Sequence, residues 1–244
     1  MKEVEFKIRE NKKIAKDIYE MKLEGDTSDI SAPGQFIDIK LDGFYLRRPI
    51  SVCDIEGNIL TIIYKILGNG TEAMTAYPAG KTLSVISGIG NGYDTSLSGN
   101  NPLLIGGGVG IPPLYLLARE FRKEDKKVTV ILGFNTSDEI FYVDEFKKLG
   151  CEIAVTTVDG SFGIPGFVTN AIPDDYSFFY TCGPEPMLKA VYKATNTSGQ
   201  FSFEARMGCG YGACMGCSCK TLTGYKRICV DGPVMMKEEI AWED

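Results

Sequence analysis

Short runs of apolar residues separated by turn residues make up the first part of the chain. They are rich in Ile, Val, Thr and aromatic side chains, the residue types that favour strands. These runs cover residues 4–10, 14–23, 35–41, 50–55, 59–66 and 82–86, with turn signals such as Ala32-Pro33-Gly34 between them. One helical segment, residues 71–77, begins directly after a Gly-Asn-Gly loop. The pattern predicts a small closed antiparallel β-barrel of six strands over residues 1–98.

After residue 98 the pattern changes to strands that alternate with helices. The predicted strands cover residues 102–105, 127–132, 151–158, 177–182 and 201–203, and the predicted helices cover 112–122, 143–149 and 184–194. Such alternation predicts a parallel sheet with helices on both faces, here over residues 99–204. The remaining residues, 205–244, offer too little apolar material for an independent core unless a cross-link such as a metal site stabilises it. The expected fold class is a multi-domain α+β protein.

Composition and charge narrow the possible functions. The chain has 244 residues, of which 44% are hydrophobic and 24% charged, as in globular proteins. The net charge of −6 gives no basic footprint for nucleic acid or for an anionic membrane. No histidine is present, which excludes Ser-His-Asp triads, HExxH zinc sites, Rieske clusters and histidine-ligated haem.

Two segments bear on location. The uncharged run of residues 102–118 is interrupted by glycines and prolines, so we expect a buried strand, loop and helix there and no membrane span. The charged N-terminal sequence MKEVEFKIRENKK has no apolar core of a secretory signal. We therefore expect a cytoplasmic protein, in which cysteines serve as ligands more readily than as disulfides.

The cysteines near the C-terminus carry the strongest chemical signal. Cys209, Cys214, Cys217 and Cys229 form a C-x4-C-x2-C-x11-C pattern, whose first three members have the plant-type [2Fe-2S] spacing. Glycines at 208, 210, 212 and 216 let the backbone wrap closely around sulfur. The alternative is a four-cysteine zinc site, but zinc ligands usually come as two C-x2-C pairs.

A second motif predicts a pyrophosphate clamp in the barrel. The sequence Arg47-Arg48-Pro49-Ile50-Ser51 is followed by Ile63-Tyr64-Lys65 and by Gly68-Asn69-Gly70-Thr71. An arginine at the start of a strand, together with a glycine loop that opens a helix, suits a phosphate group. Taken separately, each part also fits a surface ion pair or an ordinary helix cap. Their order and spacing before an α/β unit favour the clamp.

Two further loops lie at the ends of predicted strands in the α/β region. The sequence Gly106-Gly107-Gly108-Val109-Gly110-Ile111-Pro112-Pro113 is a variant of the dinucleotide-binding glycine loop. The sequence Thr181-Cys182-Gly183-Pro184 ends a later strand, and we expect it near the nicotinamide. Residues 133–146 contain four acidic residues and no Lys or Arg, which favours NADH over NADPH.

With these four motifs in order, the chain resembles the ferredoxin-NADP reductase superfamily of flavoproteins. Within it, the chain more closely resembles the electron-transfer subunits of class B dihydroorotate dehydrogenases, through RRPIS, GNGT, GGGVGIPPL, CGPEPM, MGCGYGACMGCSCK and CVDGPV. The resemblance implies the following roles: FAD at Arg48, Pro49, Ile50, Ser51, Ile63, Tyr64, Lys65, Gly70 and Thr71; NAD at Gly106, Gly107, Gly108, Gly110, Cys182 and Gly183; the [2Fe-2S] cluster at Cys209, Cys214, Cys217 and Cys229; and catalytic contacts from Ser51 and Cys182.

The resemblance also implies a function. An FMN-containing dihydroorotate dehydrogenase catalytic subunit would oxidise dihydroorotate in de novo pyrimidine (UMP) biosynthesis, and this chain would pass the electrons through the cluster and FAD to NAD+. We expect a heterotetramer of two plus two subunits, with no nucleic acid and no membrane as partner. The alternatives are a related NAD(P)H reductase subunit of the ferredoxin, sulfide or sulfite type, a zinc-tailed interaction module, and a self-sufficient reductase.

Cys219 offers a first test of the ligand assignment. In an extended Cys217-Ser218-Cys219 segment the two cysteine side chains point to opposite faces, so both are not expected to bind one cluster. We predict that Cys219→Ser retains the cluster, as measured by iron content and visible absorption. Loss of the cluster in this variant would show that Cys229 is not the fourth ligand.

Overall fold

The computed structural model describes residues 1–242 and begins with a closed antiparallel barrel. Its strands are β1 (Lys2–Ala15), β2 (Ile18–Glu24), β3 (Phe36–Ile39), β4 (Arg48–Glu56), β5 (Ile59–Lys65) and β6 (Thr82–Ile89). They are hydrogen-bonded in the order β1-β2-β5-β4-β3-β6. Helix α1 (Asn69–Thr75) joins β5 to β6, beginning two residues earlier than predicted. The predicted six-stranded barrel is confirmed.

Alternating side chains fill the barrel. In β6, for example, every second residue from Leu83 to Ile89 is buried, as expected for a strand with one face on a core. In β3 the inward residues are Ile37 and Ile39, which are completely buried with Met21 from β2. The opposite face of β3 therefore points out of the barrel.

One predicted strand boundary is wrong. The sequence suggested strands at 4–10 and 14–23, whereas β1 continues to Ala15 and the chain reverses at residues 16 and 17. Asp17 adopts a left-handed conformation with φ of 57°, which a tight hairpin turn needs. The polar residues at 10–13 are mostly exposed, but each pairs with a residue of β2 between 19 and 22, so they continue the strand and do not form a turn.

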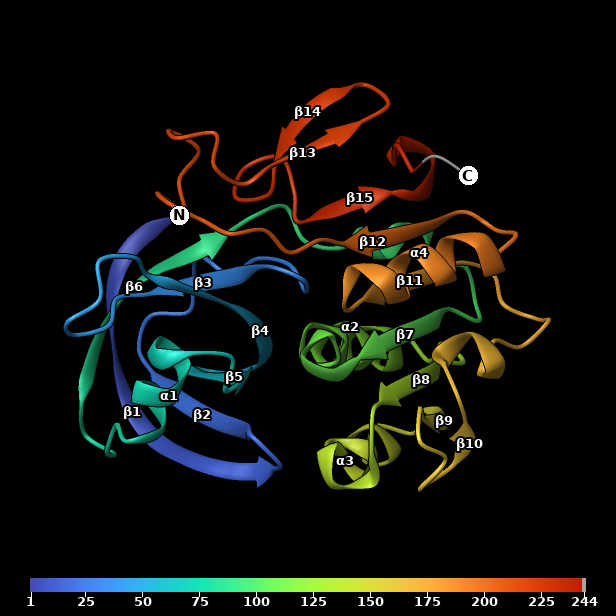
Figure 1. Ribbon diagram of the computed structural model, residues 1–244, viewed down its shortest axis with the longest axis horizontal. Coiled ribbons are helices and arrows are strands. Elements are labelled where there is room, and N and C mark those ends of the chain that lie inside the picture. Colours follow the sequence, from blue (N-terminus) through green and yellow to red (C-terminus); the bar gives the residue numbers. More distant parts are fainter. Residues whose placement is uncertain (243–244) are drawn as a thin grey trace.

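The second part is a seven-stranded sheet beside the barrel (Figure 1). It contains β7 (Leu103–Gly107), β8 (Thr129–Phe134), β9 (Glu152–Thr157), β10 (Ile164–Pro165), β11 (Phe179–Cys182), β12 (Gly199–Ser202) and β15 (Val234–Met236), in the order β10-β9-β8-β7-β11-β12-β15. Its helices are α2 (Pro112–Lys123), α3 (Val143–Lys148) and α4 (Glu185–Ala194). Short 3-10 turns lie at η1 (Thr95–Leu97), η2 (Gly108–Gly110), η3 (Ser137–Glu139), η4 (Val168–Ala171) and η5 (Lys237–Glu239).

Both faces of this sheet are covered, as a parallel sheet requires. Leu104 of β7 packs with Leu117 of α2 on one face. Its neighbour Leu103 packs with Leu188 of α4 on the other face. Successive residues of β7 are thus buried in two separate cores. This is why the strand is apolar along its whole length.

The C-terminal segment leaves the sheet and returns to it. After β12 the chain crosses above the barrel, forms a small hairpin from β13 (Ser218–Thr221) and β14 (Gly224–Arg227), and re-enters as β15 (Figure 1). Strand β15 pairs antiparallel with β12 through Gln200 with Met236 and Ser202 with Val234. The sequence placed the last strand at 201–203. Strands of two to four residues have no readable periodicity, so β15 was missed, as were β10, β13 and β14.

No helix within residues 1–242 has the length and apolar character needed to cross a membrane.

The packing of α2 gives a stability prediction. Leu117 is fully buried between this helix and the sheet. Because the truncation leaves a cavity, we expect Leu117→Ala to lower the free energy of unfolding by about 2–5 kcal/mol, measured by urea denaturation. Lys123→Ala, at the exposed end of the same helix, should change it by less than about 0.5 kcal/mol. Equal effects of the two variants would contradict the assigned packing.

Candidate functional site

A cavity of about 640 Å³ lies where the barrel, the sheet and the C-terminal segment meet. This volume is in the usual range for sites that hold a cofactor. Its walls include all nine residues expected around FAD, namely Arg48, Pro49, Ile50, Ser51, Ile63, Tyr64, Lys65, Gly70 and Thr71. Cys182 also lines it, from the end of β11. The structure therefore brings the predicted barrel residues together with Cys182.

Arg48 is held beside the N-terminus of α1. Its guanidinium donates to the backbone oxygen of Leu46 at 2.6 Å and lies over the ring of Phe44, 4.9 Å from the centroid. A β-carbon at Gly70 would lie 2.2 Å from Nε of Arg48, so only glycine leaves room for this arrangement. The result is a cationic group and a helix start on one wall of the cavity, which suits a pyrophosphate.

Other predicted residues of this wall have structural partners. Thr71 Oγ1 accepts from the amide of Leu67 at 2.9 Å and donates to the oxygen of Gly68 at 3.1 Å, which fixes the glycine loop. The Tyr64 hydroxyl donates to Asn11 Oδ1 at 2.9 Å, and burial raises its pKa. Lys65 pairs with Glu139 of η3 at 3.1 Å. Lys65 thus links the cavity wall to the loop after β8.

The glycine loop and the Cys182 loop pack against each other at the carboxyl ends of β7 and β11. Cys182 is the register partner of Gly106, and a β-carbon at Gly110 would lie 2.3 Å from the oxygen of Cys182. A β-carbon at Gly107 would lie 2.4 Å from Sδ of Met187 in α4. Gly108, with φ of 52°, has nothing within 4 Å of its β-carbon position. Its backbone is therefore open to a ligand.

These loops lie at the switch point of the sheet. Strand β7 has β8 on one side and β11 on the other, so the strand order reverses there. Dinucleotides bind in the crevice outside such a point. Of the residues expected near NAD, Cys182 reaches the cavity, whereas Gly106, Gly107, Gly108, Gly110 and Gly183 shape the crevice next to it.

Glu204 is a cavity residue that the sequence did not reveal. It follows β12, lines the cavity, and has its pKa raised because the surrounding protein desolvates it. Burial, followed by the charge of Glu204, raises the pKa of the Cys182 thiol. The only sequence signal was an acidic residue between a buried strand and the cysteine loop. No neighbouring motif in the sequence indicates a function for Glu204.

The four predicted cysteine ligands form two pairs. The Sγ atoms of Cys217 and Cys229 lie 3.4 Å apart, and both side chains are 3% exposed. Burial, then the adjacent Cys217, raises the pKa of Cys229 to about 12. At Cys209 burial opposes ionisation, but backbone amides and the Cys214 thiol outweigh it and lower the pKa to about 7.

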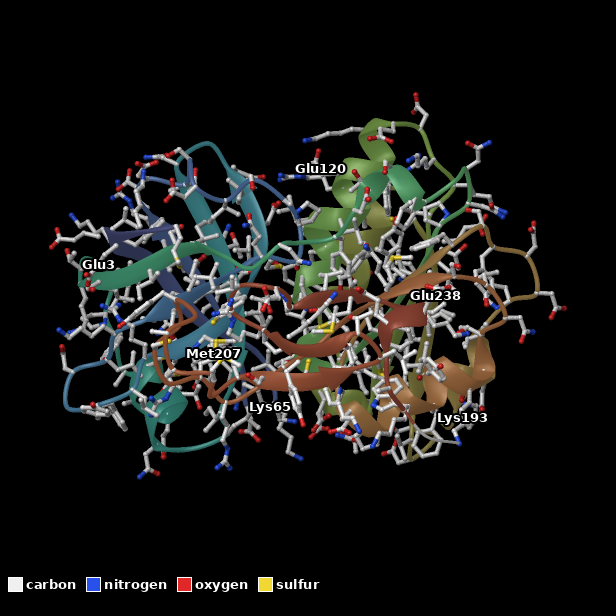
Figure 2. All side chains as sticks on the ribbon, turned by 90° about the horizontal axis from the view of Figure 1, so that it is seen from above. Glu3, Lys65, Glu120, Lys193, Met207 and Glu238 are labelled. Carbon is white, nitrogen blue, oxygen red and sulfur yellow. The ribbon has the colours of Figure 1, made fainter. Side chains whose placement is uncertain are left out.

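The surrounding loop leaves space around sulfur. The amide of Gly216 donates to Cys214 Sγ at 3.4 Å, and β-carbons at Gly208 and Gly216 would lie 3.2 and 3.3 Å from that atom. Cys219 instead contacts Sδ of Met235 at 3.8 Å. Figure 2 shows Met207, just before this loop, where the C-terminal segment passes over the barrel.

The donor set fits a two-iron cluster. In the described part of the chain, no group of three His, Cys, Asp or Glu side chains is close enough to hold one metal ion. A [2Fe-2S] cluster takes two protein ligands on each iron, and the Cys217–Cys229 pair together with the interacting Cys209 and Cys214 supplies that number of thiolates. Arg227 holds the pairs together, since it donates to the oxygen of Gly212 at 2.7 Å and pairs with Asp231 at 3.2 Å. Sequence reasoning missed Arg227.

The cysteines and the cavity share a wall. Phe36 and Ile228 both line the cavity, and both pack in one apolar group with Cys217 and Cys229. The cavity and the buried cysteine pair are therefore bordered by the same apolar group of side chains.

Two parts of the chain match known domains. Residues 204–241 match the iron-sulfur cluster binding domain of dihydroorotate dehydrogenase B, and residues 104–193 match an oxidoreductase NAD-binding domain.

Solved structures share the architecture. The structure of an NADH-dependent reduced ferredoxin-NADP oxidoreductase is 30% identical, with a TM-score of 0.88 over 97% of this chain and 90% of that one. A ferredoxin NADP+ reductase from Neisseria gonorrhoeae, 18% identical with a TM-score of 0.68, covers 80% of this chain and 90% of that one and supports the fold alone. The expected fold class is confirmed.

Full-length relatives identify the family. The dihydroorotate dehydrogenase B (NAD(+)) electron transfer subunit of Fusobacterium nucleatum is 45% identical, with 100% of each chain covered. The corresponding subunit of a Geobacillus species is 41% identical, over 98% of this chain and 99% of the relative. The resemblance noted from the motifs is confirmed. The chain belongs to the electron transfer subunits of dihydroorotate dehydrogenase B (NAD(+)), an oxidoreductase family.

Proposed function

We propose that this chain takes up electrons singly at a [2Fe-2S] cluster held by Cys209, Cys214, Cys217 and Cys229, and that these electrons reach NAD+ through FAD bound in the cavity. The observation that carries the proposal is the shared wall, in which Phe36 and Ile228 line the cavity and belong to the same apolar group as the buried Cys217 and Cys229. When bound, FAD exchanges hydride with a nicotinamide and single electrons with a cluster.

The barrel residues hold and orient the flavin. Arg48 and the glycine loop before α1 bind its pyrophosphate, for which the guanidinium already lies beside Gly70. Ser51 lies in β4 opposite Phe36 of β3 and lines the cavity from the barrel side. Cys182 lines the same cavity from the sheet. We assign both to the place where flavin and nicotinamide rings meet.

The sheet binds NAD. Gly106, Gly107, Gly108 and Gly110, with Gly183 opposite, keep the crevice free of side chains so that backbone amides approach the dinucleotide phosphates. In the segment after β8, Asp138 pairs with Lys16 and Glu139 pairs with Lys65 of the barrel. Among the described residues, residues 133–146 therefore offer no free cation for a 2′-phosphate. NADH is therefore the preferred form.

The electrons come from a partner. We divide the chain into an FAD domain, 1–98, an NAD domain, 99–204, and a cluster subdomain, 205–244, and assign the oxidation of the substrate to a separate subunit. Tyr211 and Met215 of the cysteine loop are 57% and 53% exposed, which suits docking next to the cluster. We propose an FMN-containing catalytic subunit as the partner, in a heterotetramer of two plus two.

Purification of the chain with its partners from its own cells tests the assignment. Flavin and iron-sulfur absorption, together with dihydroorotate-dependent reduction of NAD+, is the expected result. The same spectrum with a different partner and no such activity would instead support a ferredoxin-type, sulfide-type or sulfite-type reductase.

Cys214→Ser tests the division between cluster and flavin. Because the cluster ligands and the cavity residues do not overlap, the variant complex should lose dihydroorotate-dependent NAD+ reduction and keep NADH-dependent reduction of a flavin-directed dye. Cys151→Ser, at a cysteine just before β9, is the matched control and should keep both activities. Joint loss of both activities with FAD still bound would contradict separate sites.

Arg48→Ala tests the phosphate clamp. Losing charge-assisted hydrogen bonds worth about 1.5–3 kcal/mol should raise the dissociation constant for FAD by about 10- to 100-fold, measured by flavin fluorescence on dilution. Arg9→Ala, which removes an arginine paired with Glu24 on the barrel surface, serves as the control and should leave the constant unchanged. Full flavin occupancy in Arg48→Ala would count against the clamp.

A further inference from the structure

A buried carboxylate lies between the cavity and the cysteine loop. Asp38 belongs to the outward face of β3 together with Phe36, and it is 2% exposed. Its register partner in β4 is Pro49, which lines the cavity. On its other side lies the loop, because a β-carbon built on Gly210 would be 2.7 Å from Oδ2 of Asp38. Asp38 thus touches the residue that follows Cys209.

The charge of Asp38 has no direct partner. Its Oδ1 makes no hydrogen bond within residues 1–242. Arg47 is close, but it donates to Glu3 at 2.6 Å and to Ser84 Oγ at 3.2 Å. Arg48 donates to the oxygens of Leu46 and of Arg47. Burial raises the pKa of Asp38 to about 6 against the opposing effect of these two arginines.

An unpaired buried carboxylate is costly, and such groups gather where function requires them. The charged groups around Asp38 are Arg48 from β4 and Arg47 from the preceding loop, and the cysteine loop approaches it through Gly210. Each reduction adds a negative charge to an iron-sulfur centre, so a fixed negative charge nearby disfavours reduction. Net charge around the cysteines is among the factors that determine cluster potentials.

We propose that the Asp38 carboxylate lowers the reduction potential of the cluster held by the neighbouring cysteine loop, and so favours departure of electrons from the cluster toward the cavity. This inference rests on the proposed ligation by Cys209, Cys214, Cys217 and Cys229. Asp38 acts through space and is not a ligand. Its position next to Pro49 and Gly210 places the charge at the boundary that electrons cross.

Redox titration of the holoenzyme at pH 8, followed by electron paramagnetic resonance, tests the proposal. Asp38→Asn should move the cluster midpoint to a more positive value, by about tenfold in the one-electron equilibrium constant, or about 59 mV. Asp38→Ser should shift the cluster midpoint in the same direction. The midpoint can therefore still be measured in one neutral variant if the other loses the cluster. Asp38→Glu keeps the charge and should stay close to the parent.

Asp54→Asn is the matched control. Asp54 is likewise buried in the barrel, but it pairs with Arg119 of α2 and not with the cysteine loop. Its substitution should leave the cluster midpoint unchanged. An unchanged cluster midpoint in cluster-loaded Asp38→Asn would overturn the inference. Loss of FAD from this variant with an unchanged midpoint would also overturn it, because Asp38 would then serve as a counter-ion for Arg48. A cluster that persists in Cys214→Ser would instead refute the ligation itself.

Discussion

The ladder between β12 and β15 is the constraint on which the site depends. It anchors both ends of the segment that carries the cysteines, through the pairs Gln200 with Met236, Phe201 with Met235 and Ser202 with Val234. Asn91, just after the barrel, donates to the oxygen of Val234 at 2.8 Å and accepts from its amide at 3.1 Å. A loop rich in glycine has many conformations of its own. Here its two ends are held by the sheet and the barrel, so the buried cysteine pair is kept in the apolar group that borders the cavity.

This arrangement lets one cavity serve three parts of the chain. The barrel supplies Arg48 and much of the cavity wall, the end of β11 supplies Cys182, and the returning segment supplies Phe203, Glu204 and Ile228. No histidine is needed, because hydride and electron transfer depend on distance and orientation more than on a side-chain proton relay. At two points of the site a glycine allows two chain segments to approach closely, Gly70 beside Arg48 and Gly110 beside Cys182.

Local patterns in the sequence predicted the strands, the glycine loops and the cysteine spacing, since each depends on residues close together in the chain. Glu204, Arg227 and Asp38 could not be found in this way. Arg227 matters because it reaches Gly212, and Asp38 because Gly210 folds against it, and both contacts join distant segments. The turn at Asp17 was misplaced because a charged stretch on the exposed side of a strand looks like a loop. Tertiary packing decides such cases.

The antiparallel strand β15 also protects the protein from self-association. Without it, β12 would be the open edge of the sheet, with free backbone groups beside the aromatic side chain of Phe201. Exposed edges of this kind pair with other chains. Strand β15 covers that edge, ends at Met236 after three residues and is followed by Lys237. Short strands followed by lysine are poor templates for further pairing. The segment that holds the cysteines is therefore also what keeps the sheet from aggregating, and a chain truncated before Val234 would lose solubility together with its redox centre.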